Sequence, residues 1–194
     1  LSPVEAKGRV VSTAEVELIA EASGRIESGD VSLKTGQSFK KGDVLLTIYK
    51  DEAELALKAQ KSRFMNSVAN MLPDIHVDYP QYESHFKSFF NQIDLEAPLP
   101  PMPEFDSEPL KIFLASRNIL ADYYAVQQAE LKLSRHSIIA PFNGVLSAVN
   151  LEVGAYTNAG GRIGKMMSTH SLEVDVAVEN ASARWIEPGD PVVL

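Results

Sequence analysis

The sequence predicts a mainly β protein in which a β-sandwich is split into two halves by an inserted α-helical hairpin. Two observations support this prediction. A motif of short apolar runs punctuated by glycine occurs twice, at residues 22–48 and again at residues 138–166. Between the two copies, the spacing of apolar residues changes from every second residue to the three-and-four spacing of an amphipathic helix.

The two copies of the motif align through their glycines. When Gly36 is aligned with Gly154, Gly42 falls on Gly160. Glycine at this spacing suits short β-strands joined by turns that need a positive φ. One half of a sandwich cannot bury its apolar face alone. We therefore expect the two copies to pack face to face about a pseudo-twofold axis, around one shared core.

A helical hairpin is predicted between the copies. Acidic residues from Asp51 onward suit a first helical turn, and we expect this helix to run to Leu72, where Pro73 ends it. Its expected seam consists of Leu57, Phe64, Val68 and Met71. Ser107 suits the N-cap of a second, antiparallel helix that runs to Ser134. The expected seam of this second helix, at spacings of three and four, consists of Leu110, Leu114, Arg117, Ala121, Tyr124, Gln128 and Leu131.

A Pro-rich segment, residues 73–109, is expected to form the tip of the hairpin. Residues 81–93 have the pattern of a short amphipathic helix, which we expect to fold against an overhang of the longer second helix. The run 97–103 is expected to be extended polyproline that faces outward as a contact surface. The aromatic residues of the tip form either an exposed partner patch or a locally buried core. The candidate partner contacts in this segment are Tyr79, Met102 and Phe105.

Three regions are therefore expected along the chain. Residues 20–50 and 136–167 form the split sandwich, and residues 51–135 form the hairpin. Residues 1–19 and 168–194 are expected to be part of an adjacent β-barrel, because apolar and polar residues alternate near both ends of the chain.

Composition argues against several classes of function. The net charge of -8 and the pI near 5.0 argue against a nucleic-acid partner. The absence of cysteine removes disulfides, thiolate metal ligands and cysteine nucleophiles together. The four histidines have no metal-ligand spacing, and no nucleophile elbow or phosphate loop is present. We expect no catalytic residue, no bound metal and no enzyme activity.

The repeated motifs resemble those of a known family. They are ASGRI at 22–26, KGDVL at 41–45 and IAPFNGV at 139–145, the last directly after a long helix. In these motifs, and in a sandwich split by a hairpin, the chain resembles the periplasmic adaptor proteins, or membrane fusion proteins of the HlyD family, of efflux and type I secretion systems. The resemblance covers nearly the whole chain. It implies a lipoyl- or biotinyl-like sandwich, an antiparallel hairpin and part of an adjacent β-barrel.

The resemblance also implies a function and partners. It implies a non-catalytic adaptor that links an inner-membrane transporter to an outer-membrane channel protein and associates with itself into a ring. The protein would lie in the periplasm, and its anchor to the inner membrane is expected to lie outside this sequence. The tip departs from the pattern of the family, because Arg117 and Leu120 have no matching serine after them.

Two alternatives stay open from the sequence. One is a carrier-type domain serving an enzyme, and the other is a small-ligand or metal-binding sandwich, for example in a metal exporter. Carrier domains attach lipoyl or biotinyl groups to a lysine in the turn that joins the halves, and here the hairpin replaces that turn. Lys50 is the nearest lysine and lacks the Met-Lys-Met context, so no cofactor is expected.

Overall fold

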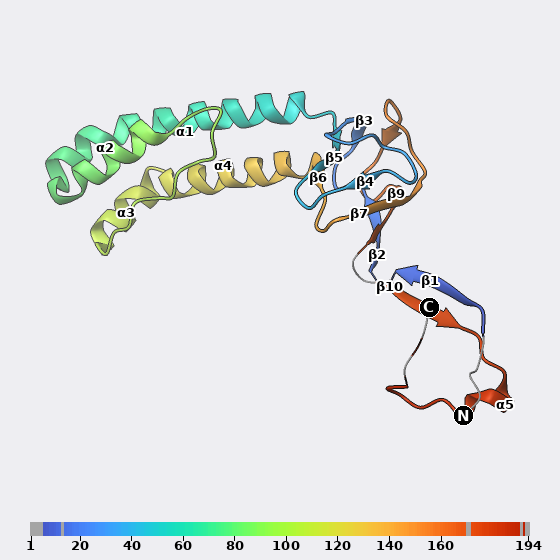
Figure 1. Ribbon diagram of the computed structural model, residues 1–194. Helices are drawn as coiled ribbons and strands as arrows, with labels where there is room; N and C mark the ends of the chain where they lie inside the picture. Colours follow the sequence, from blue (N-terminus) through green and yellow to red (C-terminus); the bar gives the residue numbers. More distant parts are fainter. Residues whose placement is uncertain (1–5, 13, 170–171, 191, 193–194) are drawn as a thin grey trace.

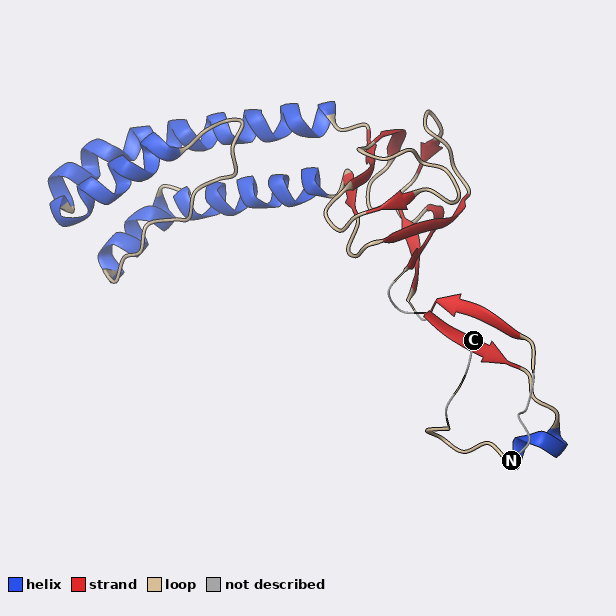
Figure 2. Ribbon diagram, in the orientation of Figure 1, coloured by secondary structure: helices blue, strands red, loops and turns tan. Residues whose placement is uncertain are grey.

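The computed structural model describes residues 6–12, 14–169, 172–190 and 192 of the 194-residue chain. A helical arm, a β-sandwich and a two-stranded β-sheet follow one another along an elongated, bent molecule (Figure 1). All of the long helices belong to the arm, and all but two strands belong to the sandwich (Figure 2).

The sandwich consists of two four-stranded antiparallel sheets. One has the order β2-β9-β7-β4, formed by Glu15–Ile19, Arg162–Ser168, Gly144–Val149 and Ser38–Phe39. The other has the order β6-β5-β3-β8, formed by Ser137–Ile139, Val44–Ile48, Gly24–Ser28 and Tyr156–Thr157. Exchanging β2 with β6, β3 with β7, β4 with β8 and β5 with β9 converts one order into the other. The predicted pseudo-twofold relation is therefore confirmed.

Both copies of the motif contribute to one core between the sheets. The buried residues are Leu18, Ala20, Ile26, Leu33, Phe39, Leu45, Leu46 and Ile48 from the first half, and Ala140, Leu146, Ile163 and Met166 from the second. The expected shared core is thus present.

The aligned glycines adopt matching backbone conformations. The φ angles are 85° and 92° at Gly36 and Gly154, and 95° and 86° at Gly42 and Gly160. No heavy atom lies within 4 Å of a Cβ built at any of the four positions. Glycine is therefore required here by the positive φ rather than by close packing.

Strand β2 lies in the sandwich, although we expected residues 1–19 to lie outside it. Glu15–Ile19 pairs with β9, and Leu18 is buried in the sandwich core. The expected boundary followed the glycine motif, which begins only after this strand. Strands β1 (Gly8–Ser12) and β10 (Leu172–Val176) form the separate two-stranded sheet, and a short helix α5 (Asn180–Ala183) follows.

The arm is built on two antiparallel helices, α1 (Asp51–Asp78) and α4 (Ile119–Ser134). The shorter helices α2 (Glu83–Gln92) and α3 (Glu108–Ser116), with the 3₁₀ turn η1 (Pro80–Tyr82), complete its far end. The buried residues of α1 recur at spacings of four and three, and they include all four expected seam residues. They are Leu57, Lys61, Phe64, Val68, Met71 and Ile75.

Helix α1 does not end at Leu72, as we expected, but continues through Pro73 to Asp78. Proline in a helix interior costs about 3 kcal/mol, because it lacks an N–H donor and its ring crowds the preceding turn. Pro73 is exposed, whereas Met71 and Ile75 on either side of it are fully buried. Burial of these two side chains offsets the cost and keeps the chain helical.

The second helix is not continuous either. It is broken at Asn118, which adopts a left-handed conformation with φ 58° and ψ 14° and starts α4. Asparagine tolerates this conformation better than most residues. Because of this break, the buried residue that follows Leu114 is Ile119, five residues later, rather than a residue three or four positions later. Beyond Leu114 the expected seam was wrong, and its residues Arg117, Ala121, Tyr124, Gln128 and Leu131 are exposed.

Residues 94–107, which we call the strap, do not cap the tip from outside. Helix α2 folds back along α1, which is the longer helix, so there is no overhang of the second helix for it to cover. The strap continues along the arm toward the sandwich and then returns to the far end (Figure 1). Leu99 and Met102 are half-buried against the hairpin core, so the proline run does not face outward as expected. The aromatic residues of the tip pack into this core, which agrees with the buried-core alternative.

We predict that Gly160→Ala lowers the free energy of unfolding by about 1–2 kcal/mol, because alanine at this φ places its Cβ against the following carbonyl. Gly160→Asn is the matched control, and it should cost less because asparagine visits this region more readily. Urea unfolding of both variants measures the difference. Equal costs would contradict a conformational role for the glycine.

Candidate partner interface on the helical arm

An ion pair between a buried lysine and a partly exposed glutamate joins three segments of the arm. The Lys61 side chain is 2% exposed, and its Nζ lies 2.9 Å from Glu130 Oε1 on α4. Lys61 Nζ also donates to the carbonyl of Ala97, at 2.6 Å, and Glu130 Oε1 accepts from the amide of Leu99, at 2.8 Å. The pair therefore fixes α1, α4 and the strap to one another. We did not predict it, although Lys61 stands at a seam position between Leu57 and Phe64.

The strap is held along its length by side chains rather than by strand pairing. Because four of the seven residues 97–103 are prolines, few backbone N–H groups need a partner. Leu99 donates to Glu130, and Met102 donates to the hydroxyl of Tyr123, at 3.2 Å. The same hydroxyl donates to the carbonyl of Pro100, at 3.4 Å. The proline content thus lowers the number of backbone donors that need a partner while the strap lies half-buried.

The far end of the arm is closed by two tyrosines. The Tyr79 hydroxyl donates to the carbonyl of Pro109, at 3.3 Å, and its ring centroid lies 5.6 Å from that of Phe113. The Tyr82 hydroxyl donates to Asp106 Oδ1, at 2.6 Å. This hydrogen bond lowers the pKa of Asp106 and raises that of Tyr82, because it stabilises the carboxylate and the protonated phenol.

The three candidate contacts do not form one exposed patch. Tyr79, Met102 and Phe105 are all half-buried and pack against the core of the arm. Tyr79 lies at the far end, whereas Met102 is bonded to Tyr123 on α4. Their role in partner contact stays a prediction.

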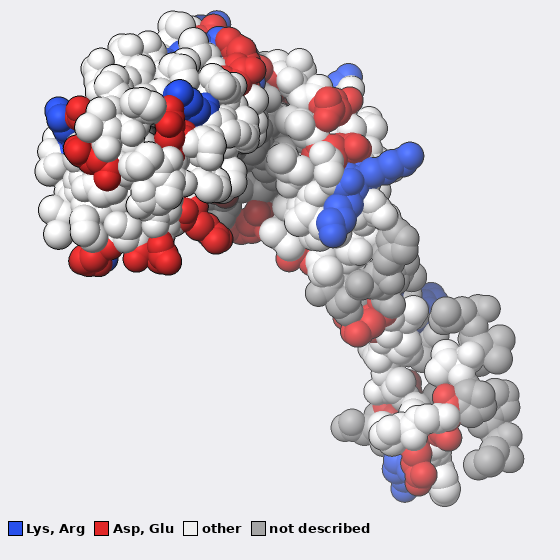
Figure 3. Space-filling model, turned by 90° about the vertical axis from the view of Figure 1, so that its left-hand side faces the viewer, with Lys and Arg blue, Asp and Glu red and all other residues white. Residues whose placement is uncertain are grey.

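The exposed apolar residues of the far end are different ones. Val77 in the last turn of α1 is 74% exposed, and Ile112 in α3 is 63% exposed. We missed Val77 because we ended the helix at Leu72. Residues 72–118 contain eight acidic and three basic residues, whereas residues 51–71 and 119–135 together contain five of each. Figure 3 shows this end toward the viewer, with acidic side chains gathered along one rim.

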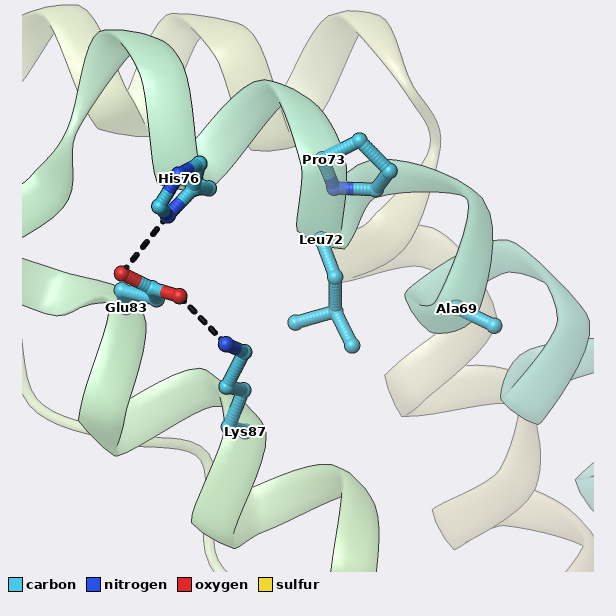
Figure 4. A pocket seen from close by; sticks show the side chains of 6 residues that line it. All are labelled: Ala69, Leu72, Pro73, His76, Glu83 and Lys87. Carbon is cyan, nitrogen blue, oxygen red and sulfur yellow. Dashed lines mark hydrogen bonds and ion pairs between the residues drawn. The ribbon is translucent and has the colours of Figure 1, made fainter.

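A shallow groove of about 350 Å³ lies between α1 and α2 near this end (Figure 4). Its polar side is Glu83, whose carboxylate lies 2.8 Å from His76 Nδ1 and also pairs with Lys87. Its apolar side is formed by Ala69, Leu72 and Pro73. The ammonium of Lys87, followed by the imidazole of His76, lowers the pKa of Glu83 below its ordinary value of 4.5.

The described residues contain no group of three or more histidine and acidic side chains arranged to hold a metal ion. His136 is buried at the base of the arm, where its Nδ1 lies 3.0 Å from the carbonyl of Lys132. His170 lies outside the described residues. Met65, Met71 and Met102 pack in the arm, and Met166 packs in the sandwich core. Lys50 precedes α1, with its ammonium 2.8 Å from Glu54.

Comparison with known proteins places the fold. No protein family matches the chain by its sequence profile. The chain is 25% identical over 169 residues to the multidrug resistance protein MdtA of Pectobacterium carotovorum, a match that covers 87% of this chain and 38% of MdtA. A chimera of MacA that carries the α-hairpin of Pseudomonas aeruginosa MexA matches with a TM-score of 0.60 at 19% identity, over 92% of this chain and 56% of the chimera. The periplasmic adaptor protein EmrA matches with a TM-score of 0.55 at 14% identity, over 96% of this chain and 82% of EmrA.

The chain is similar to the periplasmic adaptors, or membrane fusion proteins, in sequence and in fold. The resemblance inferred from the repeated motifs is thereby confirmed, as is the mainly β fold with an inserted hairpin. The family is non-catalytic, in agreement with the expectation that the chain is not an enzyme. The chain spans less than half the length of the MdtA relative. Within the part of the chain described, no helix combines the length and the apolar character needed to cross a membrane.

We predict that Lys61→Met lowers the free energy of unfolding by about 1.5–3 kcal/mol, because it removes a charged hydrogen-bond partner from Glu130, which is 24% exposed and keeps the bond from the Leu99 amide. Replacing both residues, as Lys61→Met with Glu130→Leu, should cost less than the single change. The control is Lys58→Met, which breaks an exposed pair with Glu96 and should leave stability nearly unchanged. Urea unfolding of the original protein, the two single variants Lys61→Met and Glu130→Leu, and the double variant gives the coupling. A double variant less stable than Lys61→Met would contradict this role for the pair.

Glu83 should make stability depend on pH. Since its pKa is lower in the folded arm, its ionised form contributes stability that is present above about pH 4.5 and is lost as the pH falls through the folded value. Glu83→Gln should therefore be less stable than the original protein at pH 7, and the difference should shrink as the pH falls below 4.5. Lys87→Met should reproduce more of this loss than His76→Gln, because Lys87 is the main cause of the shift. Thermal unfolding over a series of pH values from 7 downward tests this, and a difference in stability that does not shrink below pH 4.5 would contradict it.

Proposed function

We propose that the chain is part of a periplasmic adaptor that links an inner-membrane transporter to an outer-membrane channel protein in an export assembly. The observation that supports this proposal most directly is the arm. Helix α1 leaves the sandwich directly after β5, and α4 returns to it directly before β6. With 28 residues, α1 is about 42 Å long and projects away from the sandwich as a spacer.

In this proposal each part of the chain has a separate task. The far end of the arm contacts the channel, and the sandwich and the two-stranded sheet lie toward the transporter. The full-length protein resides in the periplasm, anchored at the inner membrane, and copies of it form a ring. The exposed Val77 and Ile112 supply apolar contacts at the end of the arm, since exposed apolar side chains rimmed by charge are typical of protein interfaces.

The proposal predicts that Val77→Asp with Ile112→Asp abolishes export but not folding. Both side chains are more than half exposed, so each change should alter the free energy of unfolding by no more than about 0.5 kcal/mol. A carboxylate buried against the channel should instead weaken binding by about 2 kcal/mol or more. The measurement is drug resistance of cells in which the full-length variant replaces the original protein.

Val153→Asp is the matched control, because Val153 is 51% exposed but lies on the sandwich. It should leave export unchanged. Normal export by the arm variant, at normal protein levels, would refute contact through the end of the arm.

A further inference from the structure

One dipeptide of the sandwich is chemically reactive. Asn143 is the only asparagine in the sequence that glycine follows, and Gly144 is the first residue of β7. Asparagine is among the thermolabile residues. In an Asn-Gly pair the backbone nitrogen of the glycine can attack the side-chain carbonyl carbon of the asparagine, because the glycine has no Cβ to obstruct the approach. The dipeptide is therefore a candidate site of spontaneous deamidation.

Asn143 helps to hold the two halves of the sandwich together. Its side-chain oxygen accepts a hydrogen bond from the backbone amide of Lys41, at 2.7 Å. Two backbone bonds join the same two segments. The amide of Gly42 donates to the carbonyl of Ala140, and the amide of Ala140 donates to the carbonyl of Asp43, both at 2.9 Å. The segment that ends at Asn143 is therefore fixed against a turn of the first half.

Gly144 is fixed by the sheet. It is buried, and it pairs with Phe39 of β4 on one side and with Ser168 of β9 on the other. A Cβ built on Gly144 would lie 2.2 Å from the carbonyl oxygen of Met167, a distance that real Cβ atoms essentially never show. Strand packing therefore requires glycine at this position, and an asparagine directly before it forms the reactive dipeptide.

The pseudo-twofold relation shows that this position does not require asparagine. Ser23 directly precedes the first residue of β3, as Asn143 directly precedes the first residue of β7. The Ser23 hydroxyl accepts a hydrogen bond from the backbone amide of Ala159, at 2.9 Å. Ala159 and Lys41 each directly precede one of the aligned turn glycines. Serine therefore makes in one half the bond that asparagine makes in the other, without an amide group that could be lost.

The fold hinders the reaction although water reaches the residue. Asn143 is exposed, so burial does not protect it. Phe142, directly before it, packs against Phe39 with ring centroids 6.1 Å apart, and Gly144, directly after it, is held in the sheet. To reach the nitrogen of Gly144, the side chain would have to leave the Lys41 amide, and the backbone on one side would have to shift. The attack therefore needs local opening or unfolding of the sandwich.

We propose that Asn143 is a deamidation site that the folded sandwich protects, so that the modification accumulates in chains that have opened or unfolded. The nitrogen of Gly144 gives up its proton to water or hydroxide and bonds to the side-chain carbonyl carbon of Asn143, and the amide nitrogen leaves as ammonia. Water then opens the resulting five-membered imide. The net reaction consumes water, releases ammonia and involves no oxidation or reduction. The inference is independent of the proposed adaptor function.

The two products of the reaction should behave differently when the chain refolds. Water that attacks the side-chain carbonyl of the imide gives aspartate, whose carboxylate can still accept the hydrogen bond from the Lys41 amide. Water that attacks the backbone carbonyl gives isoaspartate, which inserts one more carbon into the main chain directly before Gly144. Gly144 has no room to move toward Met167, so the isoaspartyl chain should not regain the register of β7 between β4 and β9. Chemical modification of the unfolded state in this way makes unfolding irreversible.

The test compares the purified chain incubated at mildly alkaline pH in buffer and in concentrated urea. Peptide mapping by mass spectrometry should show deamidation of Asn143 in urea, and a rate at least about tenfold lower in buffer, because the reaction needs opening. Asn143→Ser is the matched control, since Ser23 makes the equivalent bond. It should fold normally and show no modification at this position in either condition.

Refolding tests the consequence. After removal of urea, size exclusion separates folded from misfolded chains, and isoaspartate at position 143 should be enriched in the misfolded fraction at least about threefold. Asn143→Asp, which has the other product from the start, should refold as the original protein does. Equal rates of deamidation in buffer and in urea would overturn protection by the fold, and an unmodified Asn143 in urea would overturn the site itself. Isoaspartate distributed equally between the two fractions would overturn its predicted effect on β7.

Discussion

The form of the arm depends on the buried pair of Lys61 and Glu130. Removing two charges from water is costly, and their attraction repays that cost only when further hydrogen bonds satisfy the remaining polar atoms. Here the Ala97 carbonyl and the Leu99 amide supply those bonds. Apolar residues at both positions would pack as well but would tolerate other registers of the helices. The pair therefore serves mainly to select one register of α1 against α4, and it contributes less to stability. This register determines which other residues of the two helices lie opposite one another.

The strap shows how a proline-rich segment becomes part of a core. Its prolines cannot donate hydrogen bonds, and the amides of Leu99 and Met102 each have a side-chain acceptor. An extended segment without prolines would have a backbone N–H at every residue, and each N–H that faced the arm would need a hydrogen-bond acceptor. The run 97–103 thus covers α1 and α4 without belonging to a sheet. It is bonded to Lys58 and Lys61 of α1 through Glu96 and Ala97.

Sequence patterns predicted the sandwich well and the arm only in part. The glycine repeat predicted the sandwich well because few residues other than glycine adopt a positive φ. Gly36, Gly42, Gly154 and Gly160 all adopt one. The prediction of the arm was wrong at two positions. Tertiary packing keeps α1 helical through Pro73, and the left-handed conformation of Asn118 breaks the second helix. The pattern of apolar residues cannot reveal such a break, because the helical segments before and after it are each amphipathic. The burial of Met102 was missed for the same reason, because its expected exposure depended on a strap that faces outward.

The position of the insertion explains why the sandwich can accommodate an arm with its own core. Strands β5 and β6 pair directly, and the amide of Ile48 donates to the carbonyl of His136, at 2.6 Å. The two ends of the insertion are therefore held together by the sheet itself, and closing a longer loop between them adds little entropic cost. The arm is stabilised by its own buried cluster, separate from that of the sandwich. Only two residues join each end of the arm to its strand, and His136 in one of these connections is buried. Short and partly buried connections leave little freedom at the junction, so the orientation of the arm is set by the pairing of β5 with β6.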